Sequence, residues 1–121
     1  MRDLMEKKVE ASLLSGFYGA LLTPNQAQML KLYCDEDYSL TEIAGQYAVS
    51  RQSVYDTLSR AMQLMAQTEE KLHLAARSSR RLNELRELEK ALCAPEQDET
   101  ARAAARAIVR RLLSEEENNG V

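Results

Sequence analysis

The sequence predicts an all-α protein, and three observations support this prediction. The 121 residues are rich in Leu, Ala, Glu, Gln, Arg and Met, which favour helices. Residues that favour strands never cluster, and Gly and Pro, which interrupt helices, are scarce. Apolar residues instead recur at spacings of three and four, the period of an amphipathic helix.

A first helix is predicted from apolar residues of the N-terminal segment that share one helical face: Met5, Val9, Leu13, Leu14, Phe17 and Leu21. Gly16 and Gly19 lie within this pattern, and each costs helix stability relative to Ala. They indicate either a frayed or bent helix end or the close approach of a neighbouring helix.

A second helix is predicted after the motif TPNQ at residues 23–26. Thr23 is a favourable N-cap, Pro24 suits the first helical position, and Gln26 completes a capping box. We expect this helix to end at the charged stretch CDEDY and to bury Ala27, Leu30 and Tyr33.

Residues 39–58, SLTEIAGQYAVSRQSVYDTL, have the layout of a helix-turn-helix. Ser39 and Glu42 form a second capping box, which starts a short helix expected to end near residue 47, and Ser50 caps the helix that follows. Ala44 supplies the small side chain where the two helices nearly touch, and Ala48 stands at the turn. The expected core positions of the motif are Ile43, Tyr47, Val49, Val54 and Leu58.

The second helix of this motif would be the DNA-reading helix. Its cap and exposed face are expected to supply the nucleic-acid contacts, with these candidates: Ser50, Arg51, Gln52, Ser53, Tyr55, Asp56, Ser59 and Arg60. Arg and Gln are suited to base contacts. The chain, however, has a formal net charge of -3, and Asp35, Glu36 and Asp37 precede the motif. Since DNA affinity comes largely from phosphate neutralisation by Lys and Arg, we expect a monomer to bind DNA weakly.

The C-terminal half is expected to be helical throughout. Residues 50–94 lack Gly and Pro, so they form either one long helix or two joined near residues 75–79. The inner face begins with Val54, Leu58, Met62 and Met65, and later an apolar stripe that needs a partner follows: Leu82, Leu85, Leu88 and Leu92. After a break at Pro95, a last helix is expected from about Asp98 to Ser114, followed by a frayed tail.

The last helix is predicted to be amphipathic. Its outward residues are Arg102, Arg106, Arg110 and Arg111, and its inward residues are Ala101, Ala105, Ile108, Val109 and Leu112. We therefore expect a helix-turn-helix domain over residues 1–74 and a helical extension over residues 75–121. The apolar faces of the extension exceed what the first domain must cover, which favours a homodimer; the alternative is that they fold back on their own domain.

One basic cluster stands out, formed by Arg77, Arg80 and Arg81 with Arg86 nearby. Arginine favours phosphates, so this cluster suits an RNA backbone; the alternative is a solvated face paired with neighbouring glutamates.

Catalytic and metal-binding patterns are missing from the sequence. His73 has no Cys or acid at ligand or triad spacing, and Cys34 and Cys93 match no metal-binding spacing, so we expect reduced, packed cysteines. No phosphate-binding loop or dinucleotide fingerprint occurs. We expect no enzyme activity, no metal and no cofactor. No apolar run suits a membrane span or a signal peptide, so we expect a cytoplasmic protein.

Residues 17–74 resemble the YlxM family of small bacterial helix-turn-helix proteins, whose domain is similar to region 4 of sigma factors. The segments that carry this resemblance are FY.ALLTP.Q at 17–26, DYSL.EIA at 37–44, VSRQ.VYD at 49–56 and EKLHL at 70–74. Gly45, Gln46 and Ala48 depart from the family pattern, and the C-terminal segment diverges from it.

The resemblance implies a cytoplasmic, non-enzymatic regulator of the signal recognition particle pathway. The partner would be the particle's GTPase, its receptor or its small RNA. The alternative that the same motif supports is a sequence-specific DNA-binding transcriptional regulator, which would need a dimer to recover affinity.

Overall fold

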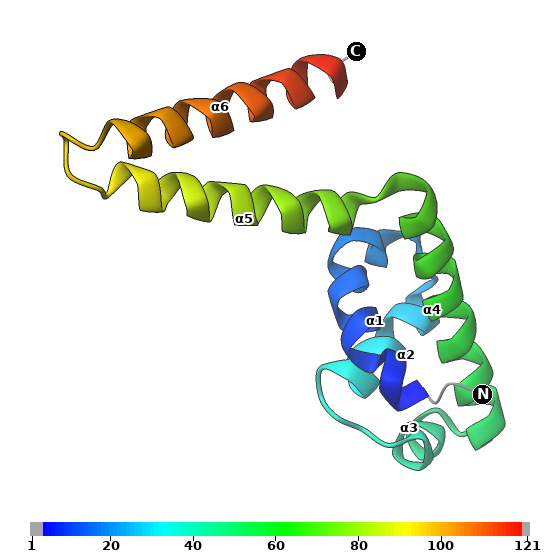
Figure 1. Ribbon diagram of the computed structural model, residues 1–121. Coiled ribbons are helices and arrows are strands. Elements are labelled where there is room, and N and C mark those ends of the chain that lie inside the picture. The colour runs from blue at the N-terminus through cyan, green and yellow to red at the C-terminus, as the bar shows by residue number, and fades with distance from the viewer. Residues whose placement is uncertain (1–3, 120–121) are drawn as a thin grey trace. The chain divides into compact units, whose positions relative to one another are not determined.

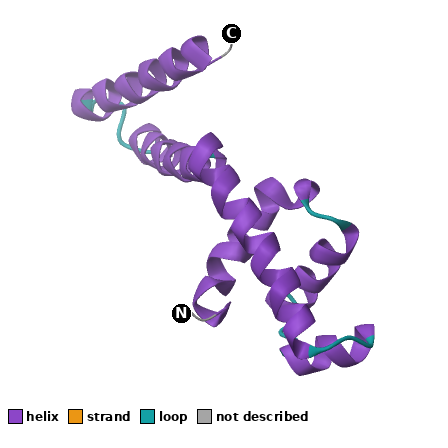
Figure 2. Ribbon diagram, turned by 90° about the vertical axis from the view of Figure 1, so that its right-hand side faces the viewer, coloured by secondary structure: helices purple, strands orange, loops and turns teal. Residues whose placement is uncertain are grey.

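The computed structural model describes the backbone of residues 4–119 and the side chains of residues 7–118. Within that range the chain is all-helical and contains no strand, which confirms the predicted fold class (Figures 1 and 2). The elements are α1 (Leu4–Tyr18), the 3-10 helix η1 (Gly19–Leu21), α2 (Pro24–Cys34), α3 (Leu40–Tyr47), α4 (Arg51–Leu72), α5 (Leu74–Leu92) and α6 (Glu99–Asn119). They divide into two compact units, Met1–Ala75 and Ala76–Val121.

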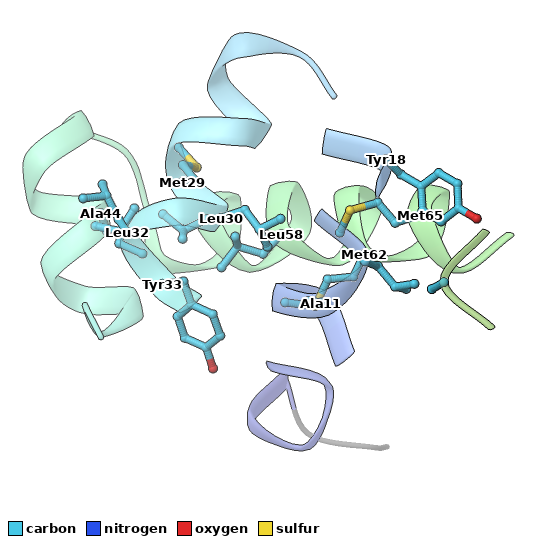
Figure 3. Close-up of a cluster of buried hydrophobic side chains, with 14 residues drawn as sticks. Ala11, Tyr18, Met29, Leu30, Leu32, Tyr33, Ala44, Leu58, Met62 and Met65 are labelled. Atoms are coloured by element: carbon cyan, nitrogen blue, oxygen red, sulfur yellow. The ribbon is translucent and has the colours of Figure 1, made fainter. Parts of the chain in front are cut away.

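The first unit is built around α4, against which α1, α2 and α3 all pack. The α4 residues predicted to face inward are all buried: Val54, Leu58, Met62 and Met65. Figure 3 shows Leu58 beside Leu30 of α2, and Met62 beside Ala11 of α1. Burying this apolar cluster is the main source of stability for the unit, because each fully buried aliphatic side chain contributes about 1.5–3 kcal/mol.

The inward face of α1 differs from the predicted one. Its buried residues are Ala11, Leu14 and Tyr18, so only Leu14 of the predicted set is correct. The other residues of that set whose side chains are described are exposed: Val9, Leu13, Phe17 and Leu21. Met5 lies outside the residues with described side chains. Both faces have helical spacing; contact with α4 favours the one that carries the small Ala11.

Both capping boxes form as predicted. The Thr23 side chain accepts from the Gln26 amide at 3.2 Å, and the Gln26 side chain accepts from the Thr23 amide at 3.0 Å. In α2, Leu30 and Tyr33 are buried as expected, whereas Ala27 is exposed. Met29 and Leu32 are buried as well, because α2 packs against three helices and uses more than one face.

The long helix is interrupted at His73, slightly before the predicted junction at residues 75–79. His73 adopts a left-handed conformation with φ 57°, which ends α4, and α5 begins at the next residue. His73 is exposed.

The second unit contains most of α5 and all of α6, which form an antiparallel hairpin (Figure 1). Asp98 caps α6 by accepting from the Ala101 amide at 3.0 Å. The helix continues to Asn119, so the prediction of a frayed tail after Ser114 was wrong over these residues. Ala105 and Ile108 face inward as predicted, but Val109 is exposed, and so are three residues of the leucine stripe: Leu82, Leu85 and Leu92.

Candidate nucleic-acid interface

The helices α3 and α4 form a helix-turn-helix whose turn is fixed by local hydrogen bonds. The Ser39 hydroxyl accepts from the Glu42 amide at 3.1 Å, and the Glu42 carboxylate accepts from the Ser39 amide at 3.0 Å. Ala48 takes a left-handed conformation with φ 54°, which reverses the chain. The Ser50 hydroxyl then accepts from the Ser53 amide at 3.0 Å and starts α4. Local sequence therefore determines the start of both helices.

The core of the motif agrees with the prediction at most positions. Ile43, Val54 and Leu58 are fully buried, the small Ala44 is buried between the helices, and Tyr47 packs partly against the same core. Val49 is the exception, since 40% of it is exposed. Its amide donates to the Ala44 carbonyl at 3.0 Å, so it continues the turn after Ala48 and faces outward.

The first turn of α4 carries the exposed residues that would approach a nucleic acid. Arg51 and Gln52 are both exposed. The Gln52 amide nitrogen, however, donates to the Asp56 carboxylate at 3.0 Å, one helical turn further on. A base contact from Gln52 would require this hydrogen bond to break, and Asp56 would still bring a negative charge to the same surface.

The remaining candidates on α4 are not all on the exposed face. Tyr55 is half-buried and packs against the hydrophobic core, which corrects its predicted position on the reading face. Ser53 and Ser59 are also half-buried, whereas Arg60 is exposed. Tyr55 and Ser59 line a groove of about 580 Å³ between α1 and α4, which also includes Lys7. The exposed basic side chains of the reading helix near its start are therefore Arg51 and Arg60.

The acidic approach to the motif is partly neutralised by α1. Lys8 forms an ion pair with Asp37 at 2.6 Å and also lies 4.9 Å from the centre of the Tyr33 ring. This hydrogen bond raises the pKa of Lys8 and lowers the pKa of Asp37 from their ordinary values. Lys8 is thus committed to an internal contact, while Asp35 and Glu36 stay exposed beside the motif.

The predicted basic cluster lies at the start of α5. Arg77 and Arg80 are exposed, and Arg81 pairs with Glu116 of α6 at 2.9 Å. The partner of Arg81 therefore lies on α6 and is not one of the neighbouring glutamates of α5. Two of the three arginines therefore present their charges to solvent without a described ion pair.

A hydrogen-bonded cluster that the sequence did not suggest joins the ends of α1 and α4 to the start of α5. The Tyr18 hydroxyl donates to the Glu69 carboxylate at 2.6 Å, and the same hydroxyl accepts from the Leu74 amide at 3.1 Å. Glu69 also accepts from the Ala75 amide at 3.0 Å. Burial, together with the bond to Glu69, raises the pKa of Tyr18. The first two amide groups of α5 are thereby satisfied by side chains of α1 and α4.

The cysteines behave differently from each other. Neither forms a disulfide. Cys34 is half-buried, its thiol donates to the Lys8 carbonyl at 3.7 Å, and burial raises its pKa. Cys93 is exposed, so the prediction that both are packed was wrong for Cys93. Among the described residues no group of three or more His, Cys, Asp and Glu could hold a metal ion.

The caps, the left-handed turn and the buried contact between α3 and α4 define a helix-turn-helix protein. A family model, UPF0122, described as "Putative helix-turn-helix protein, YlxM / p13 like", matches residues 5–104. This match covers most of the chain, and the chain belongs to the UPF0122 family. The match extends beyond residues 17–74 into α5 and the beginning of α6, so it includes the basic cluster.

Several bacterial UPF0122 proteins are similar to this chain. One from Geobacillus kaustophilus is 49% identical over 78 residues, which is 64% of this chain and 71% of the relative. One from Desulforamulus reducens is 45% identical over 84 residues, or 69% of this chain and 72% of the relative. A third, from an Exiguobacterium species, is 43% identical over 86 residues, which is 71% of this chain and 80% of the relative.

The family description names a helix-turn-helix protein and no enzyme activity. No helix within residues 4–119 combines the length and the apolar character needed to cross a membrane.

Proposed function

We propose that this protein is a non-enzymatic regulator of the signal recognition particle pathway that contacts the particle's GTPase, its RNA, or both. Membership of the YlxM-like family supports the pathway, and the acidic surroundings of the helix-turn-helix support the kind of contact. In this proposal the protein is cytoplasmic and acts as a homodimer.

One observation carries the proposal: the reading helix has little spare positive charge. Gln52 is hydrogen-bonded to Asp56, and the nearby Lys8 is paired with Asp37. Arg51 and Arg60 would then neutralise about two phosphates, which corresponds to a weak salt dependence of binding, with a slope of about -2. A motif with this surface is better suited to contact a protein than to bind duplex DNA tightly.

The RNA contact in this proposal would use the basic cluster. Arg77 and Arg80 are exposed near the start of α5, and planar guanidinium groups bind phosphate oxygens in pairs of hydrogen bonds. The helix-turn-helix would then contact the GTPase, while the beginning of α5 contacts the RNA backbone.

The test is binding of the purified full chain to the particle GTPase, with and without the particle RNA, together with GTP hydrolysis measured at increasing protein concentration. We expect binding at micromolar concentrations and a changed hydrolysis rate. The Arg77→Ala/Arg80→Ala double variant should lose the RNA-dependent part of binding. Arg102→Ala is the matched control, because Arg102 is an exposed arginine already paired with Glu99 at 3.1 Å. No binding and no change in hydrolysis would refute the proposal.

A second function, sequence-specific DNA binding, is favoured by Arg51 at the exposed, Ser50-capped start of α4. It predicts that selection from random duplexes yields a preferred site for a dimer, and that binding of the dimer weakens more steeply with salt than binding of one chain, because the phosphate contacts are doubled. The Arg51→Ala variant should then lose affinity, whereas Lys71→Ala, at the other end of the same helix, should not. Absence of a selected site would exclude this function.

A further inference from the structure

The contact between α5 and α6 buries few apolar side chains completely. Among the described side chains of the second unit, only Glu84, Ala105 and Ile108 are buried, so only two of them are apolar. Small units with such limited cores usually need additional support, and oligomerisation is one common form. We therefore expect a further apolar contact to contribute to the stability of the hairpin.

Ion pairs align the two helices but do not replace a core. Arg81 pairs with Glu116, and the Nε atom of Arg111 lies 3.2 Å from the Glu84 carboxylate. The second carboxylate oxygen of Glu84 is buried and has no hydrogen-bond partner. Exposed pairs contribute little, and a buried pair with an unsatisfied oxygen often costs as much as it gains. These pairs fix the register of the hairpin, and its stability must come from apolar contact elsewhere.

Four of the five large apolar residues described as exposed in the hairpin lie on one side of it, and the fifth, Leu82, points away from both that side and α6. In α5, Leu85 and Leu92 are seven residues apart, so they share a helical face. At about 100° per residue, that face is about a quarter turn from the face that contacts α6, on which the buried Glu84 pairs with Arg111. In α6, Val109 and Leu113 share a face that is about a quarter turn from Ala105 and Ile108, in the same rotational sense.

In two antiparallel helices, residues that are rotated about their helix axes by equal angles and in the same sense, starting from the faces in mutual contact, lie on the same side of the pair. The Arg81–Glu116 ion pair supports this geometry, because both residues are rotated in that sense from the contact line and they do meet, at 2.9 Å. We define the apolar side of the hairpin as the side that carries Leu85, Leu92, Val109 and Leu113, whose exposed fractions are 46%, 71%, 41% and 55%. Charged residues lie on the same side toward its two ends, namely Arg102 at one end and the Arg81–Glu116 pair at the other.

We propose that the apolar side of the hairpin packs against the same side of a second copy of this chain and forms a four-helix bundle. The inference names the surface of the homodimer proposed above and rests on that part of the proposed function. The four residues expose roughly 300 Å² of apolar surface, which suits the centre of an interface that buries about 800 Å² per partner. Residues 76–121 carry equal numbers of basic and acidic side chains, so two hairpins do not repel each other.

The competing surface for self-association is the outer face of α1. Val9 and Leu13 are 81% and 62% exposed. This face belongs to a unit with a large core of its own, so the unit does not need a partner for stability. Its residues supply a matched control of the same chemistry.

The experiment is light scattering of the full chain over a range of concentrations. We expect the wild type to have twice the chain mass of 13.7 kDa, and the Leu85→Glu/Leu113→Glu variant to have 13.7 kDa. Charges buried at both positions should weaken the dimer by about 100-fold or more. The Val9→Glu/Leu13→Glu variant should remain dimeric, and circular dichroism would check the helicity of each protein.

Three results would overturn this inference: a monomeric wild type, a hairpin variant that stays dimeric, or an α1 variant that becomes monomeric. A single Leu92→Glu substitution near the end of α5 gives a second test if the double variant loses helicity, and it should also weaken the dimer. Failure of the bundle leaves the GTPase and RNA measurements as a separate test of the regulatory function.

Discussion

The cluster formed by Tyr18, Glu69 and the first amides of α5 gives the most direct test of how the first unit ends. We expect Glu69→Ala to destabilise this unit, because it removes the acceptor for the Tyr18 hydroxyl and for the Ala75 amide. Hydrogen bonds to a charged group contribute about 1.5–3 kcal/mol each, and Glu69 is half-buried, so the lower end applies. The expected loss is about 3 kcal/mol in the free energy of unfolding, or about 12–24 °C in Tm for a unit of this size.

Thermal unfolding followed by circular dichroism measures this loss, and amide hydrogen exchange by NMR locates it. The Ala75 amide should exchange faster in Glu69→Ala, and the Leu74 amide should follow because its acceptor is no longer held in position. Tyr18→Phe should weaken protection of the same two amides. The matched control is Glu70→Ala, since Glu70 is exposed, and Tm should stay nearly constant. Unchanged Tm and unchanged protection in Glu69→Ala would refute the reasoning.

Three further predictions concern other parts of the chain. Urea unfolding should show that Ala48→Gly stabilises the protein by about 1 kcal/mol, because Ala48 has φ 54°. Gly45→Ala should stabilise it by about 0.5–1 kcal/mol, because a Cβ at this helical position would meet no atom within 4 Å. A loss of stability in either variant would contradict the corresponding prediction. Because the pKa of Asp37 is lowered in the folded protein, the pairing of Asp37 with Lys8 stabilises the fold at pH values above the ordinary pKa of 3.8, and this stabilisation is lost as the pH falls further. The free energy of unfolding, measured between about pH 5 and pH 2, should therefore decline less steeply in Asp37→Asn than in the wild type. Glu84→Leu should raise Tm by removing a buried, unpartnered carboxylate oxygen, and a lower Tm would show that the carboxylate is needed for stability.

The sequence predicts the local structure of this protein well, because the signals for local structure lie within a few residues of each other. Both capping boxes, the Ser50 cap and the inner face of α4 form as predicted. The orientation of α1 could not be predicted, since Val9 and Leu13 have the same helical period as Ala11 and Leu14. Which face turns inward is decided by the surface of α4, and that surface exists only in the folded unit.

The same limit applies to the candidate interface. The sequence identifies Arg51 and Gln52 as residues at the start of a reading helix, and both are exposed there. Whether Gln52 can donate to a base depends on the neighbouring Asp56, which is visible in the sequence at a spacing of four, so this contact could have been predicted. The pairing of Lys8 with Asp37 could not, because it joins residues 29 positions apart.

The shape of this helix-turn-helix does not depend on the charge of its surface. The turn needs only the caps, the left-handed Ala48 and the apolar core, and none of these requires a positive surface. Phosphate binding needs unpaired Lys and Arg beside the motif, and here the exposed Arg51 and Arg60 are accompanied by acidic residues such as Asp56. Because shape and charge are set by different residues, evidence for the shape carries little weight for DNA binding, and binding to the GTPase, to RNA and to duplex DNA must each be measured directly.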